Sequence, residues 1–360
     1  MYEERLHLMT TIEPRHLRWG ILGTASIAEA IVEGIKLSGQ GVVAAIASRD
    51  LAKAERWAQS HGQPRAFGSY DDLLVSGAVD AIYNPLPNSL HAEWTIRALE
   101  AGLPVLCEKP FTANAAEARE VLRVRDRTCL PVAEAFMYRF HPLYDRLLAL
   151  VRGGAIGEIT SIWSTFTWYL DDRTQIPASA ELAGGALMDV GCYPVNFARL
   201  IAGCEPTRAC AFQRVTIGKT RGCNPLSGPN TGVDDTLIGL LEFPNGVLAQ
   251  VACSIESHKH VRAEIVGTRG MIVLESPWNP GGETAEIVLH QARLGQAGRE
   301  ERIATPGANR FQLEVEDFSR AVLDGRPLRW PIEDAVANMA AIDALIASAR
   351  TGTVMPVEAV

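Results

Sequence analysis

The chain has 360 residues with a formal net charge of −8, and 47% of its residues are apolar and 21% charged. This length suggests two domains, and the composition is that of an ordinary globular protein. No apolar run approaches the roughly 18 residues that a membrane span needs, and no basic block offers a footprint for nucleic acid. We therefore expect neither a membrane nor a nucleic acid as a partner.

The N-terminal residues and the cysteines favour a cytoplasmic protein. Residues 1–16 form an N-terminal extension with three glutamates, and they contain neither an apolar segment nor a twin-arginine pair, so they do not resemble a secretory signal. Seven cysteines without a Cys-x-x-Cys pair predict neither a zinc site nor a disulfide framework. We expect a reducing compartment and no metal.

The first predicted strand, Leu17–Gly23, leads into a predicted helix over Ala25–Leu37. The turn between them keeps the first glycine of the dinucleotide fingerprint G-x-G-x-x-G and has alanine at the other two glycine positions. A tight turn before a helix N-terminus suits a pyrophosphate. The motif is weak by itself, and it nominates these residues for cofactor binding: Gly23, Thr24, Ala25, Ser26 and Ile27.

The second predicted strand, Val42–Ala47, runs into Ser48-Arg49-Asp50. NAD enzymes carry an acid at this point, which holds the ribose 2′-hydroxyl. Here a hydroxyl and a guanidinium come first and Lys53 follows one turn later, a set that suits a 2′-phosphate. Alternatively, Ser48 only caps the next helix and Arg49 is solvated. We favour NADP as the cofactor, with Ser48, Arg49 and Lys53 as its phosphate ligands.

Strand and helix patterns continue to alternate up to residue 140, which predicts a doubly wound parallel (Rossmann) sheet over residues 17–140. Two prolines in the Asn84–His91 segment exclude both helix and strand there. The remaining strands are predicted at residues 63–67, 80–84, 105–107 and 131–135, and the remaining helices at 52–60, 70–76, 93–101 and 115–127.

The strand within Leu103–Pro110 delivers Glu108, Lys109 and Pro110 to the carboxyl edge of this sheet. Ligands of open α/β sheets bind in the crevice at that edge. On its own the tripeptide is explained equally well by a surface lysine at the end of a strand. The assignment of this tripeptide to a binding site therefore depends on the other motifs of the chain.

Residues 141–354 are predicted to form a second, α+β domain, because long strand patterns joined by short turns indicate a large, mostly antiparallel open sheet. The Pro-Asn-Gly turn at residues 244–246 is a hairpin signal. Lys219–Thr231, rich in Gly, Asn and Pro, is predicted to be a mobile loop. Strands are predicted at residues 158–169, 206–217, 233–243, 246–257 and 261–266, and helices at 141–152, 184–201, 311–323 and 332–349.

On the predicted helix at 184–201, Asp189 and Tyr193 are four residues apart and should share one face. A nearby lysine would favour the phenolate of Tyr193. Taken alone, this pair is explained as well by an acid at a helix N-terminus and an interfacial tyrosine. No tyrosine has a lysine four residues later, so in a dehydrogenase the lysine would come from elsewhere, and Lys109 is the candidate.

Six motifs in this order give the chain a specific resemblance. They are Gly-x-x-Gly-Thr-Ala-x-Ile-Ala, Ser-Arg-Asp, Glu-Lys-Pro, Glu-Ala-Phe-Met-Tyr-Arg-Phe-His-Pro, Gly-Gly-Ala-Leu-Met-Asp-Val-Gly-Cys-Tyr-Pro and Val-Asp-Asp-Thr-Leu. Together they resemble the glucose–fructose oxidoreductase/inositol dehydrogenase family over about Leu17–Val354. Tyr193 stands where inositol dehydrogenases carry His, as in the branch of dimeric dihydrodiol dehydrogenase and NADP-dependent xylose dehydrogenase.

The resemblance implies roles for particular residues. It implies a catalytic Lys109, an acid–base Tyr193 and Asp189 as its helix-mate. It also implies nicotinamide contacts from the 84–91 segment (Asn84, Pro85, Leu86, Asn88 and His91) and from Glu108. Ala25 and Ala28 depart from the parent glycine motif, as this branch does. For the substrate pocket we expect four further side chains: Arg139, His141, Trp168 and Arg173.

We therefore expect an NADP(H)-dependent oxidoreductase that acts on a sugar or sugar-like alcohol, first an aldose 1-dehydrogenase of the xylose dehydrogenase type. A keto-sugar reductase, a dihydrodiol dehydrogenase and a non-catalytic NADP-binding sensor remain as alternatives. Glucose–fructose oxidoreductase itself is exported with a twin-arginine signal and holds its cofactor permanently. No such signal is present in residues 1–16, so we do not expect that particular activity.

One face of the antiparallel sheet is expected to stay apolar and open, which predicts a homodimer or homotetramer formed through this sheet. The family resemblance implies the same sheet-on-sheet assembly. The side chains assigned to this face are Trp163, Thr165, Thr167, Leu240, Val251 and Cys253.

Overall fold

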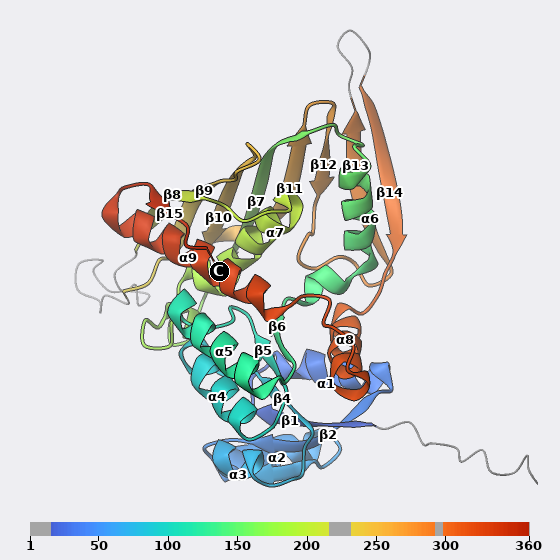
Figure 1. Cartoon of the computed structure of the whole chain (residues 1–360), viewed down its shortest axis with the longest axis vertical. Coiled ribbons are helices and arrows are strands. Elements are labelled where there is room, and N and C mark those ends of the chain that lie inside the picture. The colour runs from blue at the N-terminus through green and yellow to red at the C-terminus, as the bar shows by residue number, and fades with distance from the viewer. Residues whose placement is uncertain (1–15, 216–231, 292–297, 360) are drawn as a thin grey trace, which may run out of the picture.

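The computed structural model describes residues 16–215, 232–291 and 298–359. Nearly all of the predicted N-terminal extension and the predicted loop at 219–231 lie outside these residues. Two sheets, one above the other in Figure 1, organise the described part of the chain. The predicted α/β architecture is confirmed.

The N-terminal sheet has six parallel strands among the described residues, in the order β3-β2-β1-β4-β5-β6. Strands β4, β5 and β6 are short and buried along their whole length, as expected for a parallel sheet covered on both faces. The strands are β1 (Leu17–Leu22), β2 (Gly41–Ala47), β3 (Arg65–Phe67), β4 (Ala81–Asn84), β5 (Val105–Glu108) and β6 (Val132–Ala135).

The helices between these strands follow the prediction with one exception. Helix α4 begins at Asn88, five residues before the predicted start, so the second half of the 84–91 segment is helical and that part of the prediction was wrong. Pro87 occupies the N-cap position, where its missing N–H costs nothing. The helices are α1 (Ala28–Ser38), α2 (Leu51–Ser60), α3 (Tyr70–Leu74), α4 (Asn88–Glu100) and α5 (Ala115–Thr128).

The second sheet has nine strands among the described residues, in the order β14-β13-β12-β11-β7-β10-β9-β8-β15. All neighbours are antiparallel except β7 and β10. The strands are β7 (Ile159–Tyr169), β8 (Arg208–Arg214), β9 (Thr236–Glu242), β10 (Leu248–Ser254), β11 (Glu256–Gly267), β12 (Gly270–Leu274), β13 (Thr284–Gln291), β14 (Arg299–Pro306) and β15 (Met355–Pro356).

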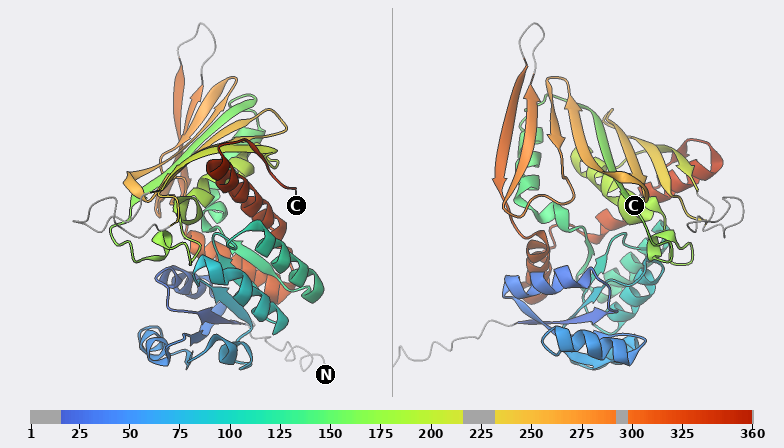
Figure 2. Two further views of the ribbon diagram at one scale, coloured as in Figure 1. Left: turned by 90° about the vertical axis from the view of Figure 1, so that its left-hand side faces the viewer. Right: turned by 180° about the vertical axis from the view of Figure 1, so that it is seen from behind.

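Helices α6 (Pro142–Arg152), α7 (Cys192–Ala202) and α9 (Ile332–Thr351) pack on one face of the large sheet (Figure 2). A 3₁₀ turn, η1 (Met137–Phe140), precedes α6, a second, η2 (Ile176–Ala178), follows β7, and a π-helical turn, η3 (Leu187–Gly191), opens α7. The opposite face exposes Trp163, Phe212, Ile238, Leu240 and Leu248.

Two residues predicted on the open face lie on the other side of the sheet. Val251 and Cys253 are only 1% and 2% exposed. In the pairing of β10 with β7, Val251 lies opposite the buried Ser164, and the outward positions of β10 are Leu248, Gln250 and Ala252. Because side chains alternate along a strand, an assignment shifted by one residue places both on the wrong face.

Helix α8 (Arg310–Asp324) returns from the second half of the chain to the N-terminal sheet. Its Val315 and Phe318 join the core formed by Trp19 and Ile31. The approach to α1 is close, because a side chain on Gly34 would lie 2.9 Å from the Phe311 backbone. The covering of the Rossmann sheet therefore includes a segment that the sequence assigned to the second domain.

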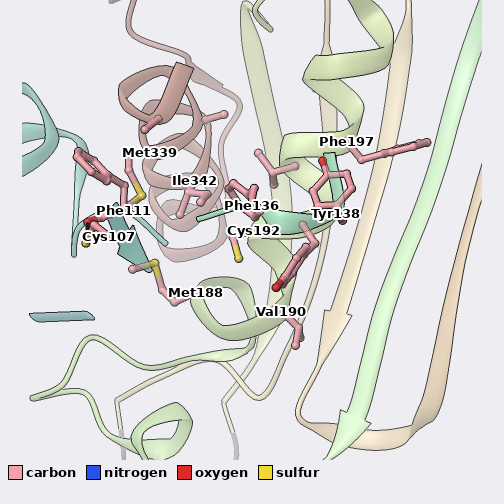
Figure 3. Packing of buried hydrophobic residues seen from close by; sticks show 14 of the residues in the cluster. Cys107, Phe111, Phe136, Tyr138, Met188, Val190, Cys192, Phe197, Met339 and Ile342 are labelled. Carbon is pink, nitrogen blue, oxygen red and sulfur yellow. Dashed lines mark hydrogen bonds between the residues drawn. The ribbon is translucent and has the colours of Figure 1, made fainter. Parts of the chain in front are cut away.

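The two sheets also share one continuous hydrophobic cluster (Figure 3). It joins Cys107 and Phe111 of the N-terminal domain to Met188 of η3 and to Cys192, the first residue of α7, with Met339 of α9 in the same cluster. Within the described ranges, no helix is long and apolar enough to cross a membrane.

Candidate active site

Lys109 follows directly on β5 and reaches across to the second domain. Its Nζ donates a hydrogen bond of 2.7 Å to the backbone carbonyl of Asp189 and lies 5.1 Å from the centre of the Tyr193 ring. The Lys109–Pro110 peptide is cis. The structure thus brings together the three residues predicted to be catalytic, from opposite sides of the domain junction.

The π-helical turn explains how Asp189 meets Lys109. The prediction placed Asp189 and Tyr193 on one face of an α-helix, but a π turn changes the backbone register by one residue. In that register the hydrogen-bond donor for the Asp189 carbonyl would be the backbone N–H of residue 194. Residue 194 is a proline and has no N–H. The ammonium group of Lys109 bonds this carbonyl, and the Asp189 carboxylate accepts a 3.0 Å hydrogen bond from Trp168 Nε1.

Tyr193 is only 6% exposed and sits in an aromatic cage. Four ring centres lie 5.3 to 5.9 Å from its own, those of Phe136, Tyr138, Phe166 and Trp278. Its hydroxyl lies 3.7 Å from Met137 Sδ, which is a weak acceptor. The cage fixes the ring without giving the hydroxyl a strong partner of its own.

The electrostatics of Lys109 and Tyr193 oppose each other. Burial raises the pKa of Tyr193, and the charge of Lys109 acts against that rise. Burial disfavours charge on Lys109, but the acidic groups around it, Tyr193 first, keep its pKa above the ordinary value. The resting pair is therefore a neutral phenol beside an ammonium ion, which can stabilise a phenolate when one forms.

The predicted phosphate-binding turn lies at the carboxyl end of β1. Gly23 has φ +81, in the left-handed region, which a side chain would disfavour. No side chain caps the N-terminus of α1, and its first amide groups donate to the carbonyls of the turn, as Ala28 N does to Ala25 O at 3.0 Å. Thr24 and Ser26 are exposed, and Ala25 and Ile27 are partly buried.

At the end of β2, the Asp50 carboxylate accepts a hydrogen bond from Lys53 N and caps α2. Ser48 Oγ accepts from Asp50 N. Asp50 is therefore engaged by its own helix, and Arg49 and Lys53 are exposed beside it. The acid next to the end of β2 thus acts as a helix cap.

The 84–91 segment is held rigidly by two of its predicted cofactor residues. Asn84 Nδ2 lies 3.2 Å from both His91 O and Thr95 Oγ1. The His91 ring bridges Pro110 O at 2.9 Å and Leu86 O at 2.6 Å. Burial lowers the pKa of His91 to about 4, so the neutral ring has one N–H to share between these two carbonyls.

Other members of this segment and Glu108 are also engaged by the protein. Pro85 and Leu86 are buried, and Asn88 donates to Ala183 O across the domain junction. Glu108 accepts a 2.7 Å hydrogen bond from the Tyr83 hydroxyl, and burial raises its pKa. These side chains form part of the carboxyl edge of the N-terminal sheet, and their nicotinamide contacts stay a prediction.

Two of the four predicted substrate residues are buried and engaged by other parts of the protein, which gives them a structural role. Arg139 is only 2% exposed, pairs with Asp334 and lies 4.5 Å from the Trp330 ring centre. Asp334 keeps its charge because Arg139 and Arg199 outweigh its burial and hold its pKa at about 2. The ring nitrogens of His141 face Leu143 N and Ala308 N at 3.1 and 3.2 Å, so this histidine caps α6.

The other two predicted substrate residues, Trp168 and Arg173, have different surroundings. Trp168 contacts Asp189 and stands in the site. Arg173 pairs with Asp235 at 2.9 Å and with Glu256, and its side chain is 23% exposed.

The sequence reading missed Trp278, Met137 and Arg310. Met137 lies in a motif that was quoted, but nothing in its spacing shows that it would face Tyr193. Arg310 opens α8, its Nε is buried without a hydrogen-bond partner, and burial lowers its pKa. No signal in the sequence identifies Trp278 or Arg310, because both reach the site through tertiary packing.

Comparison with known proteins places this geometry in a family. Residues 17–136 match the profile described as "Oxidoreductase family, NAD-binding Rossmann fold", and residues 144–273 match the "GFO/IDH/MocA C-terminal domain". The chain is 39% identical over 344 residues to D-xylose 1-dehydrogenase (NADP(+)) 2 of Haloferax volcanii, covering 95% of this chain and 100% of that protein.

Two further relatives carry different activities in their names. A dTDP-3,4-didehydro-2,6-dideoxy-alpha-D-glucose 3-reductase of Actinomadura kijaniata is 32% identical over 93% of this chain and 96% of its own. The crystal structure of a 3-ketoreductase from that organism, with NADP and TDP-benzene, superposes with a TM-score of 0.83 at 30% identity, over 93% of this chain and 98% of the other. Trans-1,2-dihydrobenzene-1,2-diol dehydrogenase of Mus musculus is 34% identical over 77% of this chain and 79% of its own. From its N-terminal sheet to its second domain, the chain belongs to the GFO/IDH/MocA family of oxidoreductases.

Proposed function

We propose that the protein is an NADP-dependent oxidoreductase that acts on a sugar or sugar-like secondary alcohol or its carbonyl form. The observation that carries this proposal is the meeting of Lys109 and Tyr193 across the domain junction, at 5.1 Å. A protein that only senses NADP needs the cofactor turn at Gly23 but has no use for a buried tyrosine beside a lysine. The family relatives named above are all oxidoreductases.

NADP fits the residues at the edge of the N-terminal sheet. The turn at Gly23 and the uncapped start of α1 suit a pyrophosphate. Ser48, Arg49 and Lys53 suit the 2′-phosphate, since Asp50 is turned toward α2. When bound, the nicotinamide accepts or supplies the hydride.

The chain's own residues hold and move the proton. In the reducing direction, the neutral hydroxyl of Tyr193 donates its proton to the substrate oxygen, and the charge of Lys109 stabilises the phenolate that remains. In the oxidising direction the same phenolate takes the proton back. Asp189 acts through its backbone carbonyl, which holds the Lys109 ammonium group in place.

For the substrate, we propose an aldose oxidised at C1, as the name of the xylose dehydrogenase relative suggests. That relative is matched over its whole length. Keto-sugar reduction is the second candidate, because the ketoreductase relative also aligns over nearly all of its length, and dihydrodiol oxidation is the third. Trp168 stands beside Asp189 and is our candidate for a substrate-contacting side chain.

We further propose that two copies associate through the open face of the large sheet. Phe212 is 78% exposed there, and Trp163 and Leu240 are 52% and 56% exposed. Solvated sheets present polar side chains on the outer face, and an apolar patch of this kind is typical of an association surface.

The experiment that tests the function combines a substrate panel with one variant. The intact protein is assayed on aldoses, keto-sugars and diols with NADP(H) and NAD(H). Tyr193→Phe, which keeps the ring in its cage and removes only the hydroxyl, should lower kcat by about 10²–10⁴-fold with the NADP Kd unchanged. Near-normal turnover by this variant, or NADP binding without turnover on the whole panel, would refute the proposal.

A further inference from the structure

The Val-Asp-Asp-Thr-Leu motif has no part in the reaction derived above, yet its first aspartate contacts the catalytic helix. Asp234 precedes β9 and is only 8% exposed. Its Oδ2 accepts a 2.8 Å hydrogen bond from Leu187 N, in the first turn of the π-helical segment. Its backbone carbonyl accepts another, of 2.7 Å, from Ala186 N.

The packing around this contact is closely fitted. A side chain on Gly185 would lie 2.3 Å from Asp234 Oδ1, and Gly185 has φ +116. The carboxylate is thus seated directly against the peptide that starts the helix. Burying an aspartate at this position is unfavourable in itself, as the rise of its pKa to about 7 indicates. The carboxylate accepts the hydrogen bond from Leu187 N in return, whereas the bond from Ala186 N goes to the backbone carbonyl and does not depend on the side chain.

These contacts continue to the catalytic lysine. Gly185 O accepts a 2.8 Å hydrogen bond from Asp189 N, and Asp189 O accepts the 2.7 Å hydrogen bond from Lys109 Nζ. A shift in the first turn would therefore move the only group within the described residues that holds the Lys109 ammonium by a hydrogen bond.

We infer that Asp234 is a positioning residue for catalysis, which acts through the π-helical turn on Lys109. This inference rests on the proposed function. It assigns to Asp234 no contact with substrate or cofactor. Its effect should appear in kcat, because misplacing a catalytic group by about 1 Å can cost on the order of 10²-fold in rate.

A matched control exists elsewhere in the chain. Asp343 of α9 has no role in the proposed reaction. Its Oδ2 accepts a 2.8 Å hydrogen bond from Ala115 N at the start of α5. Asp343→Ala therefore removes the same kind of contact, a hydrogen bond from a partly buried carboxylate to an N–H in the first turn of a helix, away from Tyr193. It reports what the loss of such a contact does to stability alone.

The test uses the full chain with Asp234→Ala, Asp234→Asn and Asp343→Ala, and Asp234→Ser in place of the first if that variant does not fold. Asp234→Ala should lower kcat by about 10–100-fold with the NADP Kd unchanged. Asp234→Asn keeps an oxygen acceptor for Leu187 N and should restore kcat to within about threefold of the wild type. Asp343→Ala should lower the Tm and leave kcat within about twofold.

The double variant Asp234→Ala/Lys109→Met shows whether Asp234 acts by positioning Lys109 or by a general effect on the fold. If Asp234 acts through Lys109, Asp234→Ala should add less than about twofold to the loss already caused by Lys109→Met. Full multiplication of the two losses, or a kcat within about threefold of the wild type for Asp234→Ala alone, would overturn the inference. A Lys109→Met variant with normal turnover would instead refute the proposed function, so the two failures are distinguishable.

Discussion

Replacing Lys109 with Met should strongly lower the rate of proton transfer while leaving the fold intact. Methionine keeps most of the length and apolar volume of the lysine side chain and removes its charge. The charge lies 5.1 Å from the centre of the Tyr193 ring. At an effective dielectric constant of about 20, two unit charges at this distance attract by about 3 kcal/mol. A phenolate formed during the reaction would lose this stabilisation, which corresponds to a loss of about 10²-fold in rate.

The assay measures kcat and kcat/KM across pH for the wild type, Lys109→Met and Lys109→Arg, with NADP affinity measured by nicotinamide fluorescence. Lys109→Arg keeps the charge but changes its geometry, so it should fall between the other two. Because Lys109 lowers the pKa of Tyr193, the pH profile for alcohol oxidation should move to higher pH in Lys109→Met only. A kcat for Lys109→Met within tenfold of the wild type, with an unmoved profile, would refute this account of the pair.

Three other predictions concern the cofactor, the assembly and the pH dependence of stability. Arg49→Ala should weaken NADP binding much more than NAD binding in titrations, and equal affinity of the intact protein for both cofactors would contradict the phosphate assignment. Leu240→Lys places a charge on the open sheet face and should convert a dimer to monomers in light scattering, with the Tm of the monomer little changed. Glu134 is buried, and its pKa is raised from 4.5 to about 8, so the folded state holds a proton that the unfolded state has released. Stability should therefore fall as pH rises between these values, by about 1.4 kcal/mol per pH unit, and Glu134→Gln should flatten this fall in thermal melts; equal slopes would show that Glu134 is ionised in the fold.

Elements with a strong local sequence pattern were predictable. Features that depend on contacts between distant parts of the chain were not. The strands around Val105 and Val132 are short apolar runs between helical patterns, which only a covered parallel sheet explains. Strand β14 lies at the edge of the sheet and begins with Arg-Glu-Glu-Arg, so its sequence has little of the apolar alternation that marks a strand. Helix α8 has a clear amphipathic pattern, but a pattern does not say which of two cores will receive its apolar face.

The same distinction separates the site residues. Lys109 was identified because the end of a parallel strand is a place defined by topology, and Tyr193 because a motif supported it. Arg139 was expected in the substrate pocket, but it is buried and paired with Asp334. Its partner Asp334 lies 195 positions later in the chain. No local sequence pattern indicates an ion pair between residues so far apart in the sequence.

The geometry of the catalytic pair is therefore a property of the domain junction more than of either domain. Lys109 is carried by β5 and Tyr193 by α7, and their separation depends on how the two sheets are packed together. Helix α9 lies against both β8 of the large sheet and α5 and β6 of the small one. Its Met339 and Ile342 complete the cluster that joins Phe111 to Cys192 (Figure 3). Because a close-packed interior transmits small displacements, a change of volume in this cluster acts on activity and stability together. Loss of the Tyr193 hydroxyl, whose only hydrogen-bond contact within the described residues is with the weak acceptor Met137 Sδ, should act on activity alone, and this contrast separates the chemistry of the site from the packing that holds it.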